Sequence, residues 1–139
     1  MKNKINYLPL ILILILFSYC SKKNASIQRT TIEFANNIHD FGSIKSKQYA
    51  NAIFSFSNSG NNPLIITDVK TTCGCTVPEY PKEPLLPNEK GEIKVIYDAK
   101  YPGRFNKTIT VFYNGKDSPK TLAIKGEVAY PKEFDTFVN

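Results

Sequence analysis

Four stretches of the chain alternate apolar residues with other residues at a period of two, at positions 49–57, 91–97, 106–113 and 121–128. Because successive side chains of a β-strand point to opposite faces, each stretch would place its apolar residues on one face of a sheet. No stretch shows a sustained helical period with capping residues at its ends. The pattern therefore predicts an all-β fold.

Turn-forming residues separate these stretches. Residues 58–63 form a dense turn cluster, and Asn114-Gly115 is a strong hairpin-turn signal. Two further β-rich runs, at 30–34 and 64–69, raise the expected number of strands to about six or seven, a number typical of a β-sandwich, with a small barrel as the alternative. Four prolines between 78 and 87 predict a loop or a sheet edge there.

The alternation also predicts which side chains form the core. In each stretch the apolar residues of one parity should face inwards, because burial of apolar surface drives folding. The predicted core consists of Phe54, Phe56, Ile93, Val95, Ile109, Val111, Leu122 and Ile124.

The composition fits one globular domain and argues against a nucleic-acid partner. The 139 residues are 42% hydrophobic and 22% charged, which is ordinary for a single folded domain. The formal net charge is +6, and it falls to +4 when the amino-terminal Lys2 and Lys4 are set aside. The lysines are scattered along the chain, whereas a nucleic-acid binder should carry a basic patch and a recognisable motif.

The amino terminus has the layout of a secretory signal. Lys2 and Lys4 precede an almost unbroken run of Leu, Ile and Phe over residues 8–17, and Cys20 follows. A transmembrane helix, retained as an uncleaved anchor, is the alternative, but it needs about 20 apolar residues. The short run therefore predicts a signal peptide over residues 1–19 that is removed on export.

The residues before Cys20, Phe17-Ser18-Tyr19, resemble a bacterial lipobox, in which the cysteine thiol is diacylated, although Tyr19 is larger than the residue usual at its position. Residues 20–29 would then form the lipidated cysteine and a flexible tether. Two acyl chains hold a protein durably on a membrane. We therefore expect a cell-envelope lipoprotein facing the periplasm or the outer surface, with its domain at 30–128 and a carboxy-terminal tail at 129–139.

Several blocks of the predicted domain together resemble one protein family. They are FSFSNSG at 54–60, PLII at 63–66, TCGCTVP at 72–78, GEI at 91–93 and LAIKG at 122–126. In these blocks the chain is similar to the DUF1573 family, bacterial envelope proteins, often lipoproteins, whose function is not established. The resemblance implies a single immunoglobulin-like antiparallel β-sandwich. It implies no activity, because one fold hosts many functions.

Cys73-Gly74-Cys75 is the one constellation in the chain that would carry chemistry. Exported compartments are oxidising, so two thiols there tend to form a disulfide. Residues two apart in an extended strand lie about 6.5 Å apart, near the upper limit for a disulfide, unless Gly74 relaxes the backbone into a turn. Such a tight disulfide would be strained and easily reduced. Two structural thiols and a metal site are the alternatives.

The neighbouring sequence supports neither a metal site nor a reactive thiol. Two thiolates suit a soft ion, but a closed zinc site needs four ligands and His39 is the only histidine. A nearby cation is what usually makes a thiol reactive, and the nearest basic residue in the sequence is Lys70. We therefore expect a structural role for Cys73 and Cys75, with no metal and no other cofactor.

No catalytic constellation is recognisable. His39-Asp40 stands among turn residues and is expected in a surface loop, and no phosphate-binding loop, dinucleotide fingerprint or nucleophile elbow occurs. The chain is therefore predicted to be no enzyme but a membrane-anchored binding or structural module, whose partner is an unknown protein of the envelope. A thiol-redox or metal-handling role for Cys73 and Cys75 is the alternative function.

Overall fold

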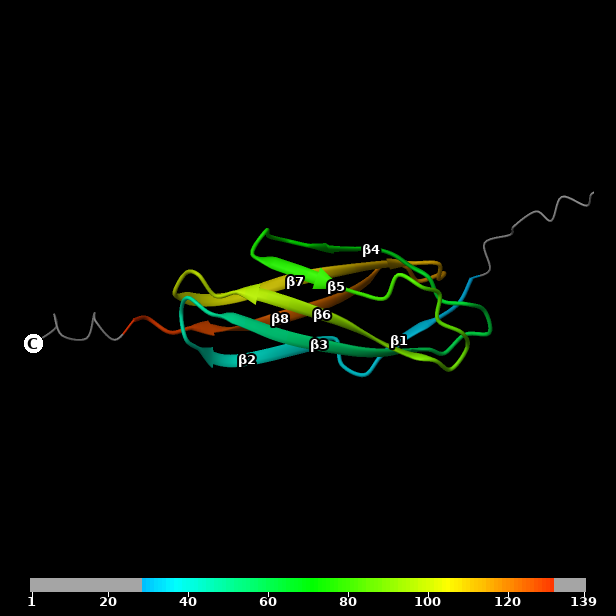
Figure 1. Ribbon diagram of the computed structural model, residues 1–139, viewed down its shortest axis with the longest axis horizontal. Helices are drawn as coiled ribbons and strands as arrows, with labels where there is room; N and C mark the ends of the chain where they lie inside the picture. Colours follow the sequence, from blue (N-terminus) through cyan, green and yellow to red (C-terminus); the bar gives the residue numbers. More distant parts are fainter. Residues whose placement is uncertain (1–28, 132–139) are drawn as a thin grey trace, which may run out of the picture.

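The computed structural model describes residues 29–131, which form eight β-strands in two four-stranded sheets packed face to face (Figure 1). The predicted signal peptide, Cys20 and the tether up to residue 28 lie outside the described residues, as does the chain after residue 131. No helix among residues 29–131 is long and apolar enough to cross a membrane. The strands are β1 Ile32–Phe34, β2 Ile38–Ile44, β3 Tyr49–Asn58, β4 Ile66–Thr71, β5 Thr76–Glu79, β6 Lys90–Asp98, β7 Gly103–Tyr113 and β8 Lys120–Val128.

The topology is that of an immunoglobulin-like sandwich. One sheet has the strand order β1-β3-β6-β5 and the other the order β2-β8-β7-β4. Every pair of strands is antiparallel except β2 and β8, which run parallel. The predicted fold class is therefore confirmed, with one parallel pair that a purely antiparallel sandwich would not contain.

The core lies between the two sheets, where the alternation placed it. Each of the eight predicted core residues is buried, and their neighbours in the facing sheet complete one continuous apolar cluster. Phe54 lies opposite Ile93 in one sheet, and Ile109 lies opposite Leu122 in the other. Local pattern and long-range pairing therefore agree on which face of each strand is inside.

Strand β2 contradicts the expectation of a surface loop around His39. His39 pairs with Ile124 of β8, and its ring lies edge-on to the ring of Phe41 with the centroids 4.5 Å apart. The register shifts between Asp40 and Ser43, next to a residue with a positive φ of 61°, Gly42. This irregularity hides the alternation, so only pairing with the last strand of the domain reveals the element.

The hairpin predicted at Asn114-Gly115 is confirmed, and its connection is longer than a two-residue turn. Strands β7 and β8 do form an antiparallel hairpin, but six residues, 114–119, connect them. The Asn114 side chain instead joins a neighbouring segment, because its Oδ1 accepts from the backbone N–H of Ile65 (2.9 Å) and its Nδ2 donates to the carbonyl of Pro63 (2.9 Å). The proline-rich stretch begins as predicted at a sheet edge, since β5 contains Pro78 and pairs on one side only.

The two ends of the sandwich carry different connections. At one end, here called the asparagine end, the chain reaches β1 and the connections β3–β4, β5–β6 and β7–β8 turn (Figure 1). At the other, the disulfide end, lie the connections β2–β3, β4–β5 and β6–β7, and the chain leaves β8 there. The blocks that carry the family resemblance contribute to both ends.

Candidate functional site

At the asparagine end, one fully buried side chain joins three segments of the chain. Asn58 is 0% exposed, and its Oδ1 accepts hydrogen bonds from Thr30 Oγ1 (2.7 Å) and the Gly60 backbone N–H (3.1 Å). Its Nδ2 donates to the carbonyls of Asn62 (2.8 Å) and Leu85 (3.0 Å). Each oxygen and hydrogen of this amide thus has a protein partner, which is what a buried polar group requires.

Gly60 completes this arrangement by allowing two backbones to approach closely. A Cβ at this position would lie 2.2 Å from Thr30 Oγ1 and 2.7 Å from the backbone nitrogen of Thr31. Any side chain would therefore push the first described residues away from Asn58. Asn58 and Gly60 therefore stabilise the fold, and no polar group of the Asn58 side chain remains for a ligand.

At the disulfide end, Cys73 and Cys75 are joined in a disulfide in the connection between β4 and β5. Their Cα atoms are 5.3 Å apart, closer than two such positions in an extended strand, because the backbone turns at Gly74. The Thr76 N–H donates to the Cys73 carbonyl (3.4 Å) across this turn, and a Cβ on Gly74 would meet no atom within 4 Å. Both cysteines are half-buried.

Two threonine hydroxyls hold the disulfide turn. Thr71 Oγ1 lies 3.0 Å from the Cys73 carbonyl and 3.1 Å from the Thr76 carbonyl, to which it can donate. Thr76 is buried, and its Oγ1 lies 3.5 Å from Cys73 Sγ, within hydrogen-bonding distance for sulfur. The two sulfurs therefore differ, because the hydroxyl of Thr76 contacts Cys73.

Cys75 forms part of the wall of a small pocket of about 230 Å³. Three basic residues line this pocket against one acidic residue, and one of the three, Arg104, pairs with Glu127, so the two lysines leave an excess of positive charge. The basic residues come from the β6–β7 loop and from β7, about 25 to 32 positions beyond Cys75 in the sequence. The residues are Lys100, Arg104 and Lys107, with Asp98 as the acidic one.

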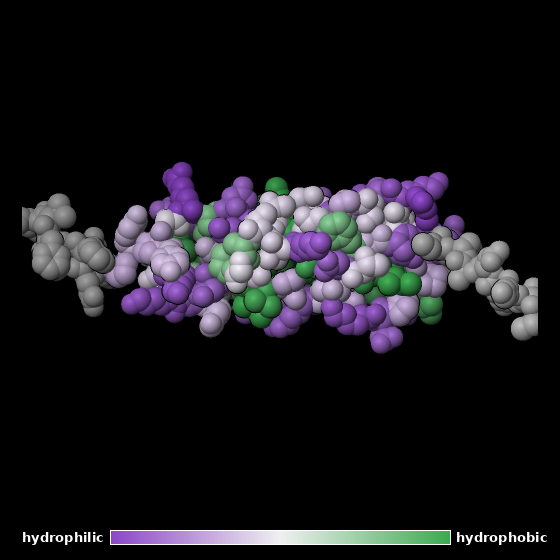
Figure 2. Space-filling model, turned by 90° about the horizontal axis from the view of Figure 1, so that it is seen from above, coloured by the Kyte–Doolittle hydropathy of each residue, from purple (hydrophilic) through white to green (hydrophobic). Residues whose placement is uncertain are grey.

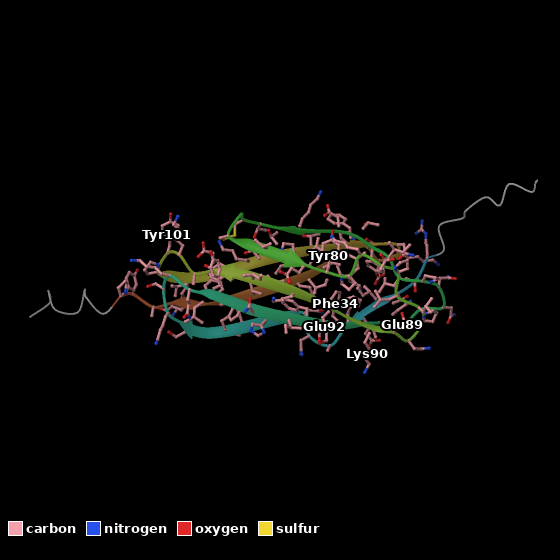
Figure 3. All side chains as sticks on the ribbon, viewed as in Figure 1. Phe34, Tyr80, Glu89, Lys90, Glu92 and Tyr101 are labelled. Atoms are coloured by element: carbon pink, nitrogen blue, oxygen red, sulfur yellow. A yellow bond between two sulfur atoms is a disulfide. The ribbon has the colours of Figure 1, made fainter. Side chains whose placement is uncertain are left out.

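Proximity of these cations to Cys75 corrects the expectation drawn from the sequence, in which Lys70 was the nearest basic residue. The cause is strand pairing, since β5 lies beside β6 and the Asp98 N–H donates to the Cys75 carbonyl (2.9 Å). That bond brings the disulfide turn to the end of β6, where the β6–β7 loop begins. Figure 3 shows Tyr101 of this loop at the disulfide end.

Aromatic residues and basic residues both line the pocket. The rings of Tyr97 and Phe105 stack with centroids 4.2 Å apart, and burial raises the pKa of Tyr97, with a smaller contribution from Asp98. Arg104 pairs with Glu127 (3.7 Å). Among the described residues, no carboxylate oxygen lies within 4.0 Å of the Lys100 or Lys107 amino group. These two ammonium groups are therefore open to an anionic ligand.

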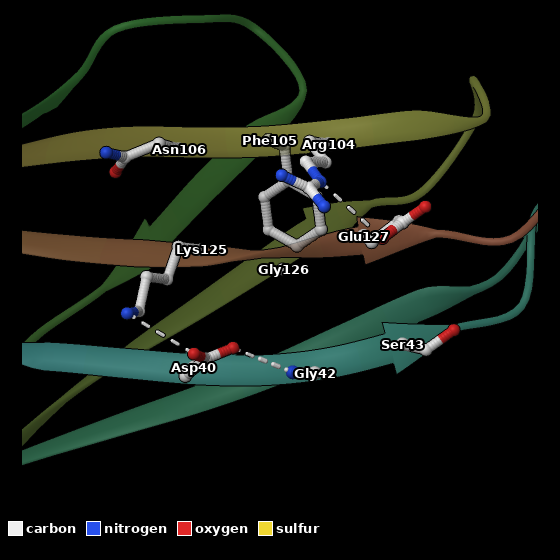
Figure 4. A pocket seen from close by; sticks show the side chains of 9 residues that line it. All are labelled: Asp40, Gly42, Ser43, Arg104, Phe105, Asn106, Lys125, Gly126 and Glu127. Atoms are coloured by element: carbon white, nitrogen blue, oxygen red, sulfur yellow. Dashed lines mark hydrogen bonds and ion pairs between the residues drawn. The ribbon is translucent and has the colours of Figure 1, made fainter.

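A larger, shallower groove of about 600 Å³ crosses the outer face of β2, β8 and β7 (Figure 4). Its charges pair with one another, Lys125 with Asp40 (3.3 Å) and Arg104 with Glu127 (3.7 Å). The Gly42 N–H, which donates to Asp40, and then the Lys125 ammonium group lower the pKa of Asp40. Because these pairs already neutralise the groove, it is a weaker candidate than the pocket beside Cys75.

The other residues singled out in the sequence do not meet at either end. His39 lies on β2 and packs against Phe41. Within residues 29–131, no group of three or more His, Cys, Asp or Glu side chains is arranged to hold a metal ion. Cys20 lies outside the described residues. The candidate site is therefore the pocket with the Cys73–Cys75 disulfide in its wall.

The comparisons with known proteins agree on the fold. The family model described as "Protein of unknown function (DUF1573)" matches residues 32–128. No curated protein matches the chain.

Among solved structures, a protein of unknown function from Porphyromonas gingivalis W83 is similar with a TM-score of 0.64 and 15% identity over 73% of this chain and 48% of its own. The seventh PapD-like (ASH) domain of human CEP192 has a TM-score of 0.62 at 9% identity, covering 74% of this chain and 88% of that chain. The VesB protease of Vibrio cholerae has a TM-score of 0.54 at 12% identity, covering 74% and 32%. The chain thus spans about half of the Porphyromonas protein and a third of the protease, and at these identities the likeness shows the fold alone.

Proposed function

The chain belongs to the DUF1573 family, and from this membership and its immunoglobulin-like fold we propose that it is a non-enzymatic protein-binding module of the cell envelope, tethered to a membrane by an acylated Cys20. The signal-like amino terminus and the lipobox-like residues before Cys20 support the anchor. Sandwiches of this kind offer sheet faces and edges to partner chains, which supports the binding role.

The observation that carries the proposal is a cluster of exposed apolar side chains on the outer face of the sheet β1-β3-β6-β5. Ile53 and Val77 are 54% and 55% exposed. Val77 pairs directly with Ile96, and Ile53 is diagonal to Ile96 across the β3–β6 pair. Figure 2 shows another view of the surface, on which hydrophobic residues form small patches among hydrophilic ones. Apolar side chains gathered beside a free sheet edge are suited to a partner chain.

The position of the tether is compatible with a partner on this face. The chain joins the sandwich at the asparagine end, where the Asn62 side chain donates to the Arg29 carbonyl (2.8 Å). The nine residues 20–28 span about 30 Å when extended, and a nine-residue strand such as β6 has about the same length. A tethered domain could thus turn its apolar cluster towards a neighbour on the same membrane.

Site-specific photocrosslinking in intact envelopes tests the binding role. A photoreactive residue at position 53 or 77 should give the same discrete adduct, whereas one at the exposed Thr121, on the outer face of the opposite sheet, should not. Val77→Lys should abolish the adduct formed from position 53, because a charge would then enter the apolar contact. The same adduct from position 121, or no adduct from 53 and 77, would contradict the proposal.

Metabolic labelling tests the anchor separately. The wild-type chain should incorporate a palmitate analogue and sediment with membranes, and Cys20→Ala should do neither, because the acylated thiol is lost. Labelling of Cys20→Ala at the wild-type level would show that the anchor assignment is wrong.

A further inference from the structure

We propose that the Cys73–Cys75 disulfide is a site of thiol–disulfide exchange, at which the thiolate of a cysteine flanked by acidic residues in a partner chain attacks Sγ of Cys75. This activity goes beyond the binding role proposed above. It rests on three features of the disulfide end, which are the different surroundings of the two sulfurs, the charge of the pocket and the size of the pocket.

The surroundings of the two sulfurs assign the direction of attack. Cys75 lines the pocket, and Cys73 does not. Cys73 instead has the buried hydroxyl of Thr76 at 3.5 Å from its Sγ. A hydroxyl that donates to a thiolate stabilises it and improves it as a leaving group. Attack at Cys75 therefore uses the sulfur of the cysteine that lines the pocket and releases the sulfur that has a hydrogen-bond donor beside it.

The charge of the pocket selects an anionic partner. Lys100 and Lys107 outnumber Asp98 in the lining and have no carboxylate partner among the described residues, whereas Arg104 pairs with Glu127. Clefts lined by charges of one sign attract ligands of the opposite sign and accelerate their arrival. The attacking species is a thiolate, so the same cations that attract acidic flanking residues also favour the reactive form of the thiol.

The size of the pocket favours a peptide side chain over a whole small molecule. Its volume is about 230 Å³, below the roughly 300–1,000 Å³ typical of small-molecule sites. It can take a cysteine side chain of a partner, while the acidic neighbours of that cysteine pair with Lys100 and Lys107 in its lining. A cysteine in an acidic stretch of a protein is therefore the occupant that fits.

The exchange balances with a partner that holds two thiols. The first thiolate attacks Cys75 Sγ, the bond between Cys73 and Cys75 breaks, and its electron pair leaves on Cys73 Sγ. The second thiolate of the partner attacks the partner sulfur of the mixed disulfide, and the electron pair of that bond leaves on Cys75 Sγ. The partner dithiol is oxidised to a disulfide and Cys73–Cys75 is reduced to two thiols, a transfer of two electrons.

Synthetic peptides with one cysteine test the first step on the full-length chain, purified from membranes in detergent. An acidic peptide with Asp and Glu around the cysteine should react at least tenfold faster at low salt than a basic peptide of equal length with Lys at those positions. High salt should remove most of the difference. After alkylation of the released thiol, mass spectrometry should place the peptide on Cys75 and the alkyl group on Cys73.

Paired charge variants locate the attraction. Lys100→Gln with Lys107→Gln should slow the acidic peptide several-fold more than a neutral peptide, because the neutral peptide loses only the stabilisation of its thiolate. Lys90→Gln with Lys116→Gln is the matched control, because it removes the same charge from two exposed positions outside the pocket. Lys90 lies towards the asparagine end (Figure 3). This double variant should change neither rate. Equal rates for acidic and basic peptides, or an equal loss in both double variants, would overturn the proposal.

Thr76 variants test the leaving group independently of charge. Thr76→Val removes the hydroxyl and keeps the shape, and it should slow exchange with acidic and neutral peptides alike, whereas Thr76→Ser should restore the rate. Melting curves of both variants show whether each is folded at the assay temperature, and a slow Thr76→Val that is folded supports the assignment. Unchanged exchange in folded Thr76→Val, or a peptide found on Cys73, would overturn it.

Discussion

Both ends of the sandwich contain small polar residues around a glycine, but the polar groups are bonded internally at one end and line a pocket at the other. At the asparagine end, every hydrogen-bonding group of the Asn58 amide is bonded to Thr30 or to a backbone group within the domain. At the disulfide end, Lys100 and Lys107 line a pocket and no carboxylate of the described residues pairs with them. The first end holds the domain together, and the second contains the pocket at which we propose exchange with a partner.

This difference separates two blocks that look alike as sequence. Both the FSFSNSG block and the TCGCTVP block combine small polar residues with a glycine. Gly60 is required because a side chain would collide with Thr30, whereas a Cβ on Gly74 would meet open space. The two blocks are told apart by their hydrogen bonds and contacts and not by their sequences. The FSFSNSG block stabilises the fold, and the TCGCTVP block contributes to the candidate site.

Substitution of Asn58 should give the largest effect on stability. Asn58→Ala removes four hydrogen bonds at a fully buried position, and each hydrogen bond contributes about 0.5–1.5 kcal/mol, so we expect a loss of about 3 kcal/mol or more in the free energy of unfolding. Asn61→Ala, at an exposed neighbouring position, should lose almost nothing. Urea unfolding followed by fluorescence or circular dichroism measures both. A loss below about 1 kcal/mol for Asn58→Ala would remove the distinction between the ends.

Removal of the disulfide should have a smaller effect on stability. Cys73→Ser with Cys75→Ser opens a loop of only three residues, for which chain entropy predicts a contribution of about 1.5 kcal/mol or less. The double variant should therefore fold, retain its β-sheet circular-dichroism spectrum and still crosslink through position 53. If it unfolds at room temperature, the disulfide is part of the scaffold and the two ends do not differ as described.

The smallest effect should be an acid sensitivity at the asparagine end. Hydrogen bonds from the Lys120 ammonium group and the Tyr113 hydroxyl lower the pKa of Asp117 from 3.8 to about 2. A carboxylate whose pKa is lower in the folded protein stabilises the fold above its unfolded pKa, and this contribution disappears as the pH falls from about 4 to about 2.

Melting temperatures of the wild type and Asp117→Asn across this window test the effect. The wild type should melt at a higher temperature than Asp117→Asn at pH 4, and this difference should disappear by pH 2. Asp40→Asn is the comparison outside the asparagine end, because Asp40 is an exposed residue of β2 whose pKa is also lowered. A constant difference between wild type and Asp117→Asn across this range would show that the Asp117 contacts do not contribute.

Local pattern explains why most of the fold could be predicted. Phe54, Ile109 and Leu122 were placed in the core because a period of two needs only neighbouring residues to be visible. Strand β2 escaped because Gly42 and the register shift beside it break the period, and because its hydrogen bonds come from β8, some 80 positions away. A strand that is stabilised mainly by pairing with a distant strand is difficult to recognise from its own sequence.

The sequence by itself determined the all-β class, the inward face of the strands that alternate, and the presence of two cysteines around a glycine. Those properties depend on residues close together in the chain, and the alternation of a pleated strand makes them readable. Only the tertiary structure decided that Cys75 borders a cationic pocket. Lys100 and Lys107 line the same pocket as Cys75 because β5 pairs with β6, and residues this far apart in the sequence cannot be recognised as neighbours until the strand pairing is known.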